Sequence, residues 1–169
     1  MKKIISILSL SLIVSFTSLY AEVEGYQDLK FGLTKREVGP IHKKYCGYVS
    51  SHLGVSCKKI LGNDTMISVF YDKEEELLSE VLISFKFKVR KDQNKLKNAL
   101  NKKFKFFSEI KESDTKTFNV YAKGQVWFWK EGDGWKLDYV DPEMAEKYLK
   151  FYKIGKDGKV IGESGEDDI

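Results

Sequence analysis

Both histidines and both cysteines of the chain lie in one window from His42 to Cys57, which reads HKKYCGYVSSHLGVSC. These residue types can bind a zinc or copper ion, form a thiol and imidazole nucleophile pair, or close a disulfide. A metal site would use His42, Cys46, His52 and Cys57, and a nucleophile pair would use His42 and Cys46. The compartment largely decides between these chemistries, because thiolate ligands compete with oxidation.

The N-terminal residues have the three-part layout of a secretory signal peptide. Two lysines precede an apolar run, and small and polar residues follow up to Ala21. Serines and threonines interrupt the run, so cleavage fits better than a permanent anchor of about 20 apolar residues. We expect a periplasmic or secreted bacterial protein. Its expected organisation is a signal peptide at 1–21, one domain at 22–154 and a flexible tail at 155–169.

An oxidising compartment favours a disulfide between Cys46 and Cys57, and ten residues lie between them. Closing a loop of this size stabilises a fold by about 2–3 kcal/mol through chain entropy. The order H-x3-C-x5-H-x4-C matches none of the usual paired metal-ligand spacings. His42 and Cys46 would share one helical face, so a metal-binding or enzymatic site in this window remains an alternative.

Charge and motifs argue against several classes of function. Removing residues 1–21 takes away two lysines and no acidic residue, which lowers the formal charge from +4 to +2. A nearly balanced domain disfavours nucleic-acid binding, which usually needs a strongly basic surface. The chain has no G-x-S-x-G, HExxH, P-loop or dinucleotide fingerprint. Asp138 and Asp141 can be pictured as glycosidase carboxylates, but we expect solvated charges there, no cofactor and no catalysis.

Hydrophobic periodicity predicts an α+β fold with an antiparallel sheet and helices on one face. The first helix is expected at Thr34 with the capping box TKRE, with an interruption at Gly39-Pro40 and a second segment ending near Cys46. The segments SCKKI, TMISVFYD and SEVLISFKFKV read as strands, and so do TFNVYAK, QVWFWK and WKLDYV. A second helix is expected from Asp92, with Phe104 and Phe107 in its apolar stripe.

The last helix is expected to begin at Asp141-Pro142-Glu143, which combines an N-cap, a first-turn proline and a first-turn acid. Its inward side would carry Met144, Tyr148, Leu149 and Tyr152. The complete order is helix, three strands, helix, three strands, helix. This order indicates a duplicated α-β-β-β unit followed by a C-terminal helix.

The stretch FGLTKREV, from Phe31 to Val38, resembles the G-M-T-x-x-x-V helix entry of small outer-membrane-assembly accessory lipoproteins. Those proteins pack helices on a three-stranded antiparallel sheet, and β-lactamase-inhibitory proteins carry a related unit twice. The resemblance covers eight residues and the coarse α-β-β-β order. It implies a non-catalytic binding or assembly module that contacts a protein or a cell-envelope component. An inhibitor of a secreted hydrolase is the alternative within the same resemblance.

Two surfaces are candidates for that contact. In a strand, Trp127 and Trp129 point to one face and Phe128 to the other. If Phe128 faces the helices, the two indoles form an exposed platform for a sugar, a peptide or a protein. The alternative is that the Trp face is a core face and that this strand is buried on both sides. Between residues 86 and 105 the chain has nine basic residues and one acid, so Lys95 and Lys102 are candidate electrostatic contacts. A solvated helix face is the alternative for these lysines.

The predicted disulfide can be tested on the natively exported protein by intact mass spectrometry. The oxidised protein should weigh two hydrogens less than the reduced one, because the S–S bond replaces two S–H bonds. Thiol alkylation should add mass only after reduction. Two alkylated cysteines in the unreduced sample would contradict the pairing and favour the metal or nucleophile alternative.

Overall fold

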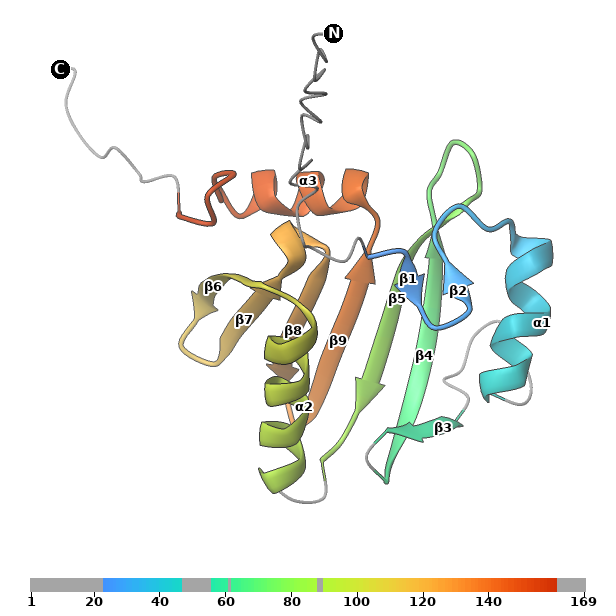
Figure 1. Ribbon diagram of the computed structural model, residues 1–169, viewed down its shortest axis with the longest axis horizontal. Coiled ribbons are helices and arrows are strands. Elements are labelled where there is room, and N and C mark those ends of the chain that lie inside the picture. Colours follow the sequence, from blue (N-terminus) through green and yellow to red (C-terminus); the bar gives the residue numbers. More distant parts are fainter. Residues whose placement is uncertain (1–22, 47–55, 61, 88–89, 161–169) are drawn as a thin grey trace, which may run out of the picture.

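The computed structural model describes residues 23–46, 56–60, 62–87 and 90–160 (Figure 1). Seven strands of this part form one sheet in which every pair is antiparallel, in the order β3-β4-β5-β9-β8-β7-β6. These strands are β3 (Ser56–Ile60), β4 (Asn63–Tyr71), β5 (Leu78–Phe85), β6 (Phe106–Ser113), β7 (Lys116–Tyr121), β8 (Val126–Glu131) and β9 (Gly134–Val140). The expected α+β class with an antiparallel sheet is confirmed.

The helix α1 (Lys35–Cys46) follows a small hairpin of β1 (Gly25–Tyr26) and β2 (Leu29–Lys30). The Glu37 carboxylate accepts hydrogen bonds from the backbone N–H and the hydroxyl of Thr34, at 2.9 and 2.7 Å. The expected interruption at Gly39-Pro40 is wrong, because α1 runs through Pro40. A proline here removes one backbone hydrogen bond, and burial of one side of the helix offsets that loss. The buried residues are Val38, His42, Tyr45 and Cys46.

The second half of the sheet contains one strand more than expected. The helix α2 (Arg90–Lys103) begins two residues before the predicted cap Asp92, and four strands follow it. The additional strand is β6, although the sequence predicts that the helix extends to Phe107. It forms the edge of the sheet and is rich in Glu and Ser, so its apolar alternation is weak. The two halves therefore differ by a strand, and an internal duplication stays a prediction.

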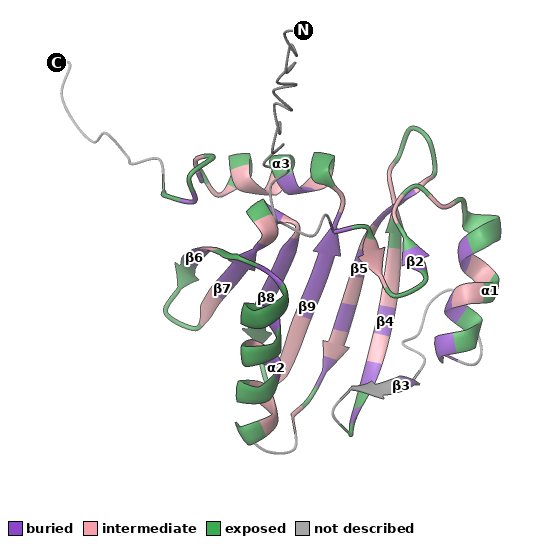
Figure 2. Ribbon diagram, viewed as in Figure 1, coloured by how far each residue is buried: buried purple, intermediate pink, exposed green. Residues whose placement is uncertain are grey.

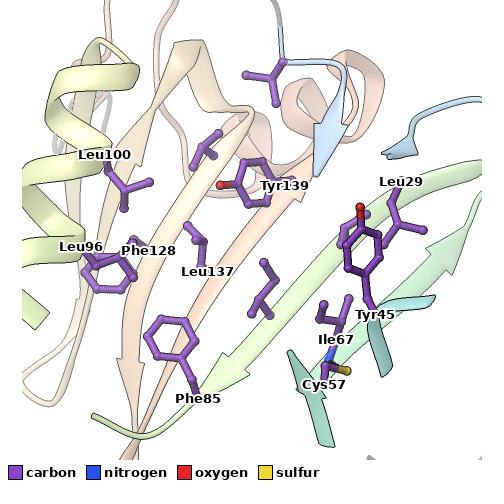
Figure 3. Close-up of a cluster of buried hydrophobic side chains, with 14 of the residues drawn as sticks. Leu29, Tyr45, Cys57, Ile67, Phe85, Leu96, Leu100, Phe128, Leu137 and Tyr139 are labelled. Carbon is purple, nitrogen blue, oxygen red and sulfur yellow. Dashed lines mark hydrogen bonds between the residues drawn. The ribbon is translucent and has the colours of Figure 1, made fainter. Parts of the chain in front are cut away.

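The sheet has an apolar core on each face. Much of β8 and β9 is buried (Figure 2). On the first face, α1 and α2 cover a cluster that includes Phe85, Phe128, Leu137 and Tyr139 (Figure 3). On the second face, α3 (Pro142–Phe151) covers another cluster. The prediction that all helices lie on one face is therefore correct for α1 and α2 and wrong for α3. The reason is that β8 is buried on both sides and needs two covers. The second cluster includes Ile110, Phe118, Val120, Trp127, Val140 and Ala145.

The chain after α3 forms a turn that meets β6. Ile154 and Val160 form a β-bridge, and the N–H of Gly155 donates to the carbonyl of Lys159 at 2.7 Å. Gly158 has φ +82°, and a Cβ there would lie 2.3 Å from the carbonyl oxygen of Phe107. Glycine is therefore required where this turn meets β6. Residues 155–160 thus form a turn that packs on β6, the flexible tail stays a prediction, and residues 161–169 lie outside the described part.

The predicted signal peptide also lies outside the described residues. Within the described ranges, no helix has both the length and the apolar character needed to cross a membrane.

The N-cap of α3 provides a stability test. Asp141 Oδ1 accepts a hydrogen bond from the N–H of Met144 at 2.7 Å, as the sequence predicts. Asp141→Ala should lower the free energy of unfolding by about 1 kcal/mol, because the first turn loses its acceptor. Asp141→Asn is the matched control and should stay near wild type, since Asn caps helices equally well. Urea unfolding measures both, and equal losses in the two variants would contradict a capping role.

Candidate functional site

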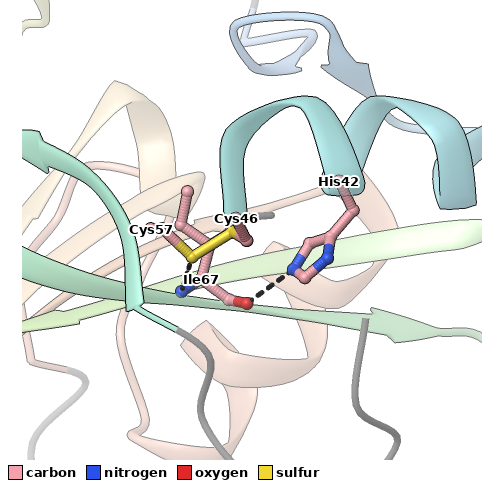
Figure 4. The surroundings of a disulfide bond; sticks show 4 residues. All are labelled: His42, Cys46, Cys57 and Ile67. Atoms are coloured by element: carbon pink, nitrogen blue, oxygen red, sulfur yellow. Dashed lines mark hydrogen bonds between the residues drawn. A yellow bond between two sulfur atoms is a disulfide. The ribbon is translucent and has the colours of Figure 1, made fainter. Parts of the chain in front are cut away.

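The cysteine and histidine window forms a structural link between α1 and the sheet (Figure 4). The Sγ atoms of Cys46 and Cys57 are 2.06 Å apart, which is the expected pairing. His42 Nε2 donates to the carbonyl oxygen of Ile67 at 2.8 Å, and Ile67 N–H donates to Cys57 Sγ at 3.3 Å. The paired sulfurs cannot serve as thiolate ligands or nucleophiles, and His52 lies outside the described residues. No cluster of three or more potential metal ligands occurs among the described side chains.

The predicted tryptophan platform is largely covered. Phe128 does face the core under α2, so both indoles point to the opposite face as expected. Trp127 is only 2% exposed, however, and Trp129 is half-buried. The exposed platform is therefore wrong for Trp127, and the alternative of a strand buried on both sides is confirmed there, because α3 crosses this end of the second face. The Trp127 indole N–H donates to the carbonyl of Gly124 and holds the ring in place.

A cavity of about 520 Å³ remains where α3 meets the sheet. Its volume lies in the range of small-ligand sites. Helix α3 contributes one side, and β5, β7, β8 and β9 contribute the other. Most of its apolar surface is aromatic, from Phe118, Trp127, Trp129, Tyr148, Phe151 and Tyr152.

The aromatic rings hold one another in a continuous cluster. The Phe118 centroid lies 5.6 Å from Trp127, 5.2 Å from Trp129 and 5.2 Å from Tyr152. Tyr148 meets Trp127 edge to face at 5.6 Å. Contacts of this geometry contribute about 0.5–1.5 kcal/mol each beyond simple burial. The wall of the cavity is therefore formed by rings fixed by their neighbours.

Two carboxyl groups lie among these rings. Leu82 pairs with Asp138 and Glu80 pairs with Val140 across β5 and β9, so Glu80 and Asp138 are diagonal neighbours on one face. Asp138 is only 3% exposed. Burial, followed by the charge of Glu80, raises the pKa of Asp138 to about 8. The expectation of a solvated charge is therefore wrong for Asp138, because alternation along β9 turns it under α3.

Glu80 is held by the helix above it. The hydroxyl of Tyr148 donates to Glu80 Oε2 at 3.1 Å. Burial raises the pKa of Glu80, and this hydrogen bond opposes the shift. Asp141 takes no part, because its carboxylate caps α3. The acid pair that the structure brings together is thus Glu80 with Asp138.

Two polar atoms in the cavity lining have no hydrogen-bond partner among the described residues: Asp138 Oδ1 and Trp129 Nε1. An unpaired buried polar group costs about 1–3 kcal/mol. One atom is an acceptor when the carboxyl is ionised, and the other is a donor. A ligand that enters the cavity and displaces the side chains covering these two atoms would supply the missing hydrogen bonds.

The cavity is also lined by two lysines that already have acidic partners. Lys116 Nζ lies 2.9 Å from Glu112 and 4.8 Å from the centroid of the Phe118 ring. Lys147 Nζ lies 2.7 Å from Glu143. Their charges are thus balanced by residues outside the lining. The Phe118 ring already carries a cation on its face, which is favourable for an aromatic quadrupole.

The other predicted contacts lie elsewhere. Lys95 and Lys102 are exposed on α2, which covers the first face of the sheet, whereas Trp127 and Trp129 lie on the second. Lys95 Nζ is 3.4 Å from Asp92. The structure therefore does not combine these lysines with the tryptophans in one surface.

Sequence reasoning missed the acid pair. Alternation in WKLDYV puts Asp138 on the same side as Lys136 and Val140, a mixed face that did not indicate burial. Its pairing with Glu80 depended on strand order, which the sequence did not supply.

No protein-family model matches this chain, and neither the curated proteins nor the solved structures contain a significant match to it.

The buried Asp138 predicts a pH-dependent stability. The unfolded carboxyl ionises near 3.8 and the folded one at about 8, so the folded state holds an extra proton between these values. The contribution of Asp138 to stability is complete below about pH 4 and falls as pH rises towards 8, by up to about 1.4 kcal/mol per pH unit.

Asp138→Asn should remove this contribution. The stability of the variant relative to wild type should therefore increase from pH 5 to pH 8 in urea unfolding. Glu109→Gln, on the exposed side of β6, is the control and should follow wild type. A constant difference between Asp138→Asn and wild type across this range would show that Asp138 ionises normally.

Proposed function

We propose that the protein is an exported, non-catalytic binding protein of the bacterial cell envelope, which binds its partner in the cavity under α3. One observation carries this proposal: a cavity walled by aromatic rings contains two polar atoms, on Asp138 and Trp129, without partners among the described residues. Concave sites with an apolar wall and a few convergent polar groups are typical of ligand binding.

The arrangement of the acids supports binding over glycoside hydrolysis. Hydrolysis needs two carboxyl groups that flank the scissile bond from both sides. Glu80 and Asp138 instead come from adjacent strands of one wall. Glu80 also accepts a hydrogen bond from Tyr148. The two carboxyl groups can therefore contact a ligand from one side only, which is suited to binding a ligand and not to cleaving a bond within it.

Export is supported by the predicted signal peptide and by a cysteine pair at disulfide distance, which is compatible with an oxidising compartment. The resemblance of Phe31 to Val38 to envelope-assembly modules supports the same location. A hydrolase inhibitor is the second candidate from that resemblance. The concave site fits a protein that receives a ligand better than an inhibitor, which would need a protruding surface to fill an enzyme cleft.

Site-specific photocrosslinking in the native cells would test this proposal. Phe151 lines the cavity and is 77% exposed, so a p-benzoylphenylalanine residue there replaces one exposed aromatic ring with another. It should crosslink an envelope component on illumination. The matched control carries the same residue at Lys102, on the opposite side of the sheet, and should give no such product.

A product from position 102 alone would contradict the cavity proposal and favour the basic side of α2. If the protein were exported normally and neither position gave a product, neither the cavity nor the basic side of α2 would be a binding surface.

A further inference from the structure

We infer that the cavity under α3 receives a cationic group, an ammonium or guanidinium on an apolar stem, with Asp138 and Glu80 as its counter-ions. This inference rests on the proposed function and names the ligand chemistry of the same site. It depends on the position of the acids, on the aromatic wall and on the pairing of the surrounding lysines.

The acids and rings provide complementary contacts for such a group. Asp138 Oδ1 is buried and has no hydrogen-bond partner among the described residues, so it can accept from an N–H donor. The half-buried rings of Trp129 and Tyr148 line the same cavity. A cation over such rings gains about 0.5–2 kcal/mol, and more as water is excluded. The apolar stem would contact the same rings.

The charges around the acids leave room for another cation. Lys116 and Lys147 are paired with Glu112 and Glu143. Lys136 lies on the same face of β9, but its Nζ contacts Ser84 Oγ at 2.9 Å and Glu131 at 3.5 Å. Each neighbouring lysine thus has another described partner. None of the salt bridges between described residues includes Asp138 or Glu80.

Competing ligand classes fit less well. A sugar stacks on a flat and free aromatic face, whereas Tyr148 and Tyr152 both lie 5.6 Å from Trp127 and occupy its surroundings. An anion would meet two carboxyl groups and would be repelled once either ionises. A cation stabilises the ionised form of both groups and pairs Asp138 Oδ1.

Proton release would accompany binding of a cation. Glu80 on β5 and Tyr148 on α3 interact electrostatically with Asp138, and Lys147 on α3 and Lys116 on β7 line the same cavity. Burial and the charge of Glu80 raise the pKa of Asp138 to about 8, so the empty site is mainly protonated at neutral pH. A cation stabilises the carboxylate and displaces this proton. Below pH 8, the affinity for the cation should therefore increase about tenfold for each unit by which the pH is raised.

The cation could come from a free small amine or from a basic side chain of a polypeptide. The exposed ring of Phe151 borders the cavity, and Phe70, directly opposite Glu80 on β4, is 44% exposed. These rings offer a peptide additional contacts that a small amine cannot reach. Phe151→Ala should weaken a peptide several-fold and leave a small amine unchanged if the source is a polypeptide. It should affect both equally if the source is a free amine.

Calorimetry with defined probes would test the inference on the full mature chain. The probes are agmatine, acetyl-Ala-Arg-Ala-amide and the same peptide with neutral citrulline in place of arginine. At least one arginine-type probe should bind at least tenfold more tightly than the citrulline peptide. Titrations at pH 6.5 in buffers of different ionisation enthalpy should show about one proton released per ligand.

Asp138→Asn should weaken binding at least tenfold at pH 9 and remove the proton release, whereas Glu109→Gln should match wild type. Equal binding of the citrulline and arginine peptides, or binding without proton release, would overturn the inference. So would the absence of binding by every probe. If photocrosslinking from position 151 still succeeded in that case, the proposed function would stand and only the cationic ligand would be rejected.

Discussion

Strand β8 is apolar on both faces, and the architecture depends on covering both. Val126 and Phe128 face the core beneath α2, while Trp127 faces α3. A strand with apolar side chains on both faces needs a layer of other residues on each side, so both faces of the sheet must be covered at β8. At β4 and β5 the second face is half-exposed, with Met66, Ser68, Leu82 and Ser84. A cover on the second face is therefore needed over β7 to β9 alone, and the sheet changes from two-sided to one-sided burial beside Asp138.

The length and origin of α3 explain why this cover is incomplete. Its ten residues span about 15 Å, roughly three strand spacings. It starts directly after β9 and crosses the ends of the strands towards β6 (Figure 1), where the Tyr152 hydroxyl donates to Glu112 at 2.9 Å. Trp127 near the start of β8 is fully covered, and Trp129, two residues further along, is half-buried. The cavity lies where the cover by α3 ends, between the buried Trp127 and the half-buried Trp129.

The sequence predicted the class, the disulfide, the α3 cap and the alternation of β8, because each depends on local patterns. It failed where distant contacts outweigh local preferences. Packing of Val38 and Tyr45 carries α1 through Pro40, although proline is a poor helix residue. Edge strand β6 has little apolar pattern and is held by pairing with β7. For the candidate site, the direction of Trp127 was predictable, but its cover by α3 was not. Pairing of β5 with β9 brings Glu80 to Asp138, and that pairing joins residues far apart in the chain.

The Asp138 carboxyl is unfavourable for folding, and this cost supports the proposed binding site. A buried ionisable group without full hydrogen bonding is destabilising, and an apolar side chain of similar size would fit the rings better. The same desolvation that raises the pKa of Asp138 strengthens any electrostatic contact made inside the cavity. The free energy lost on burial can therefore be recovered in part when a ligand supplies the missing donor. A rigid aromatic wall adds to this effect, since its rings need little reordering on binding. The stability cost of the site and its proposed ligand binding thus have one physical origin.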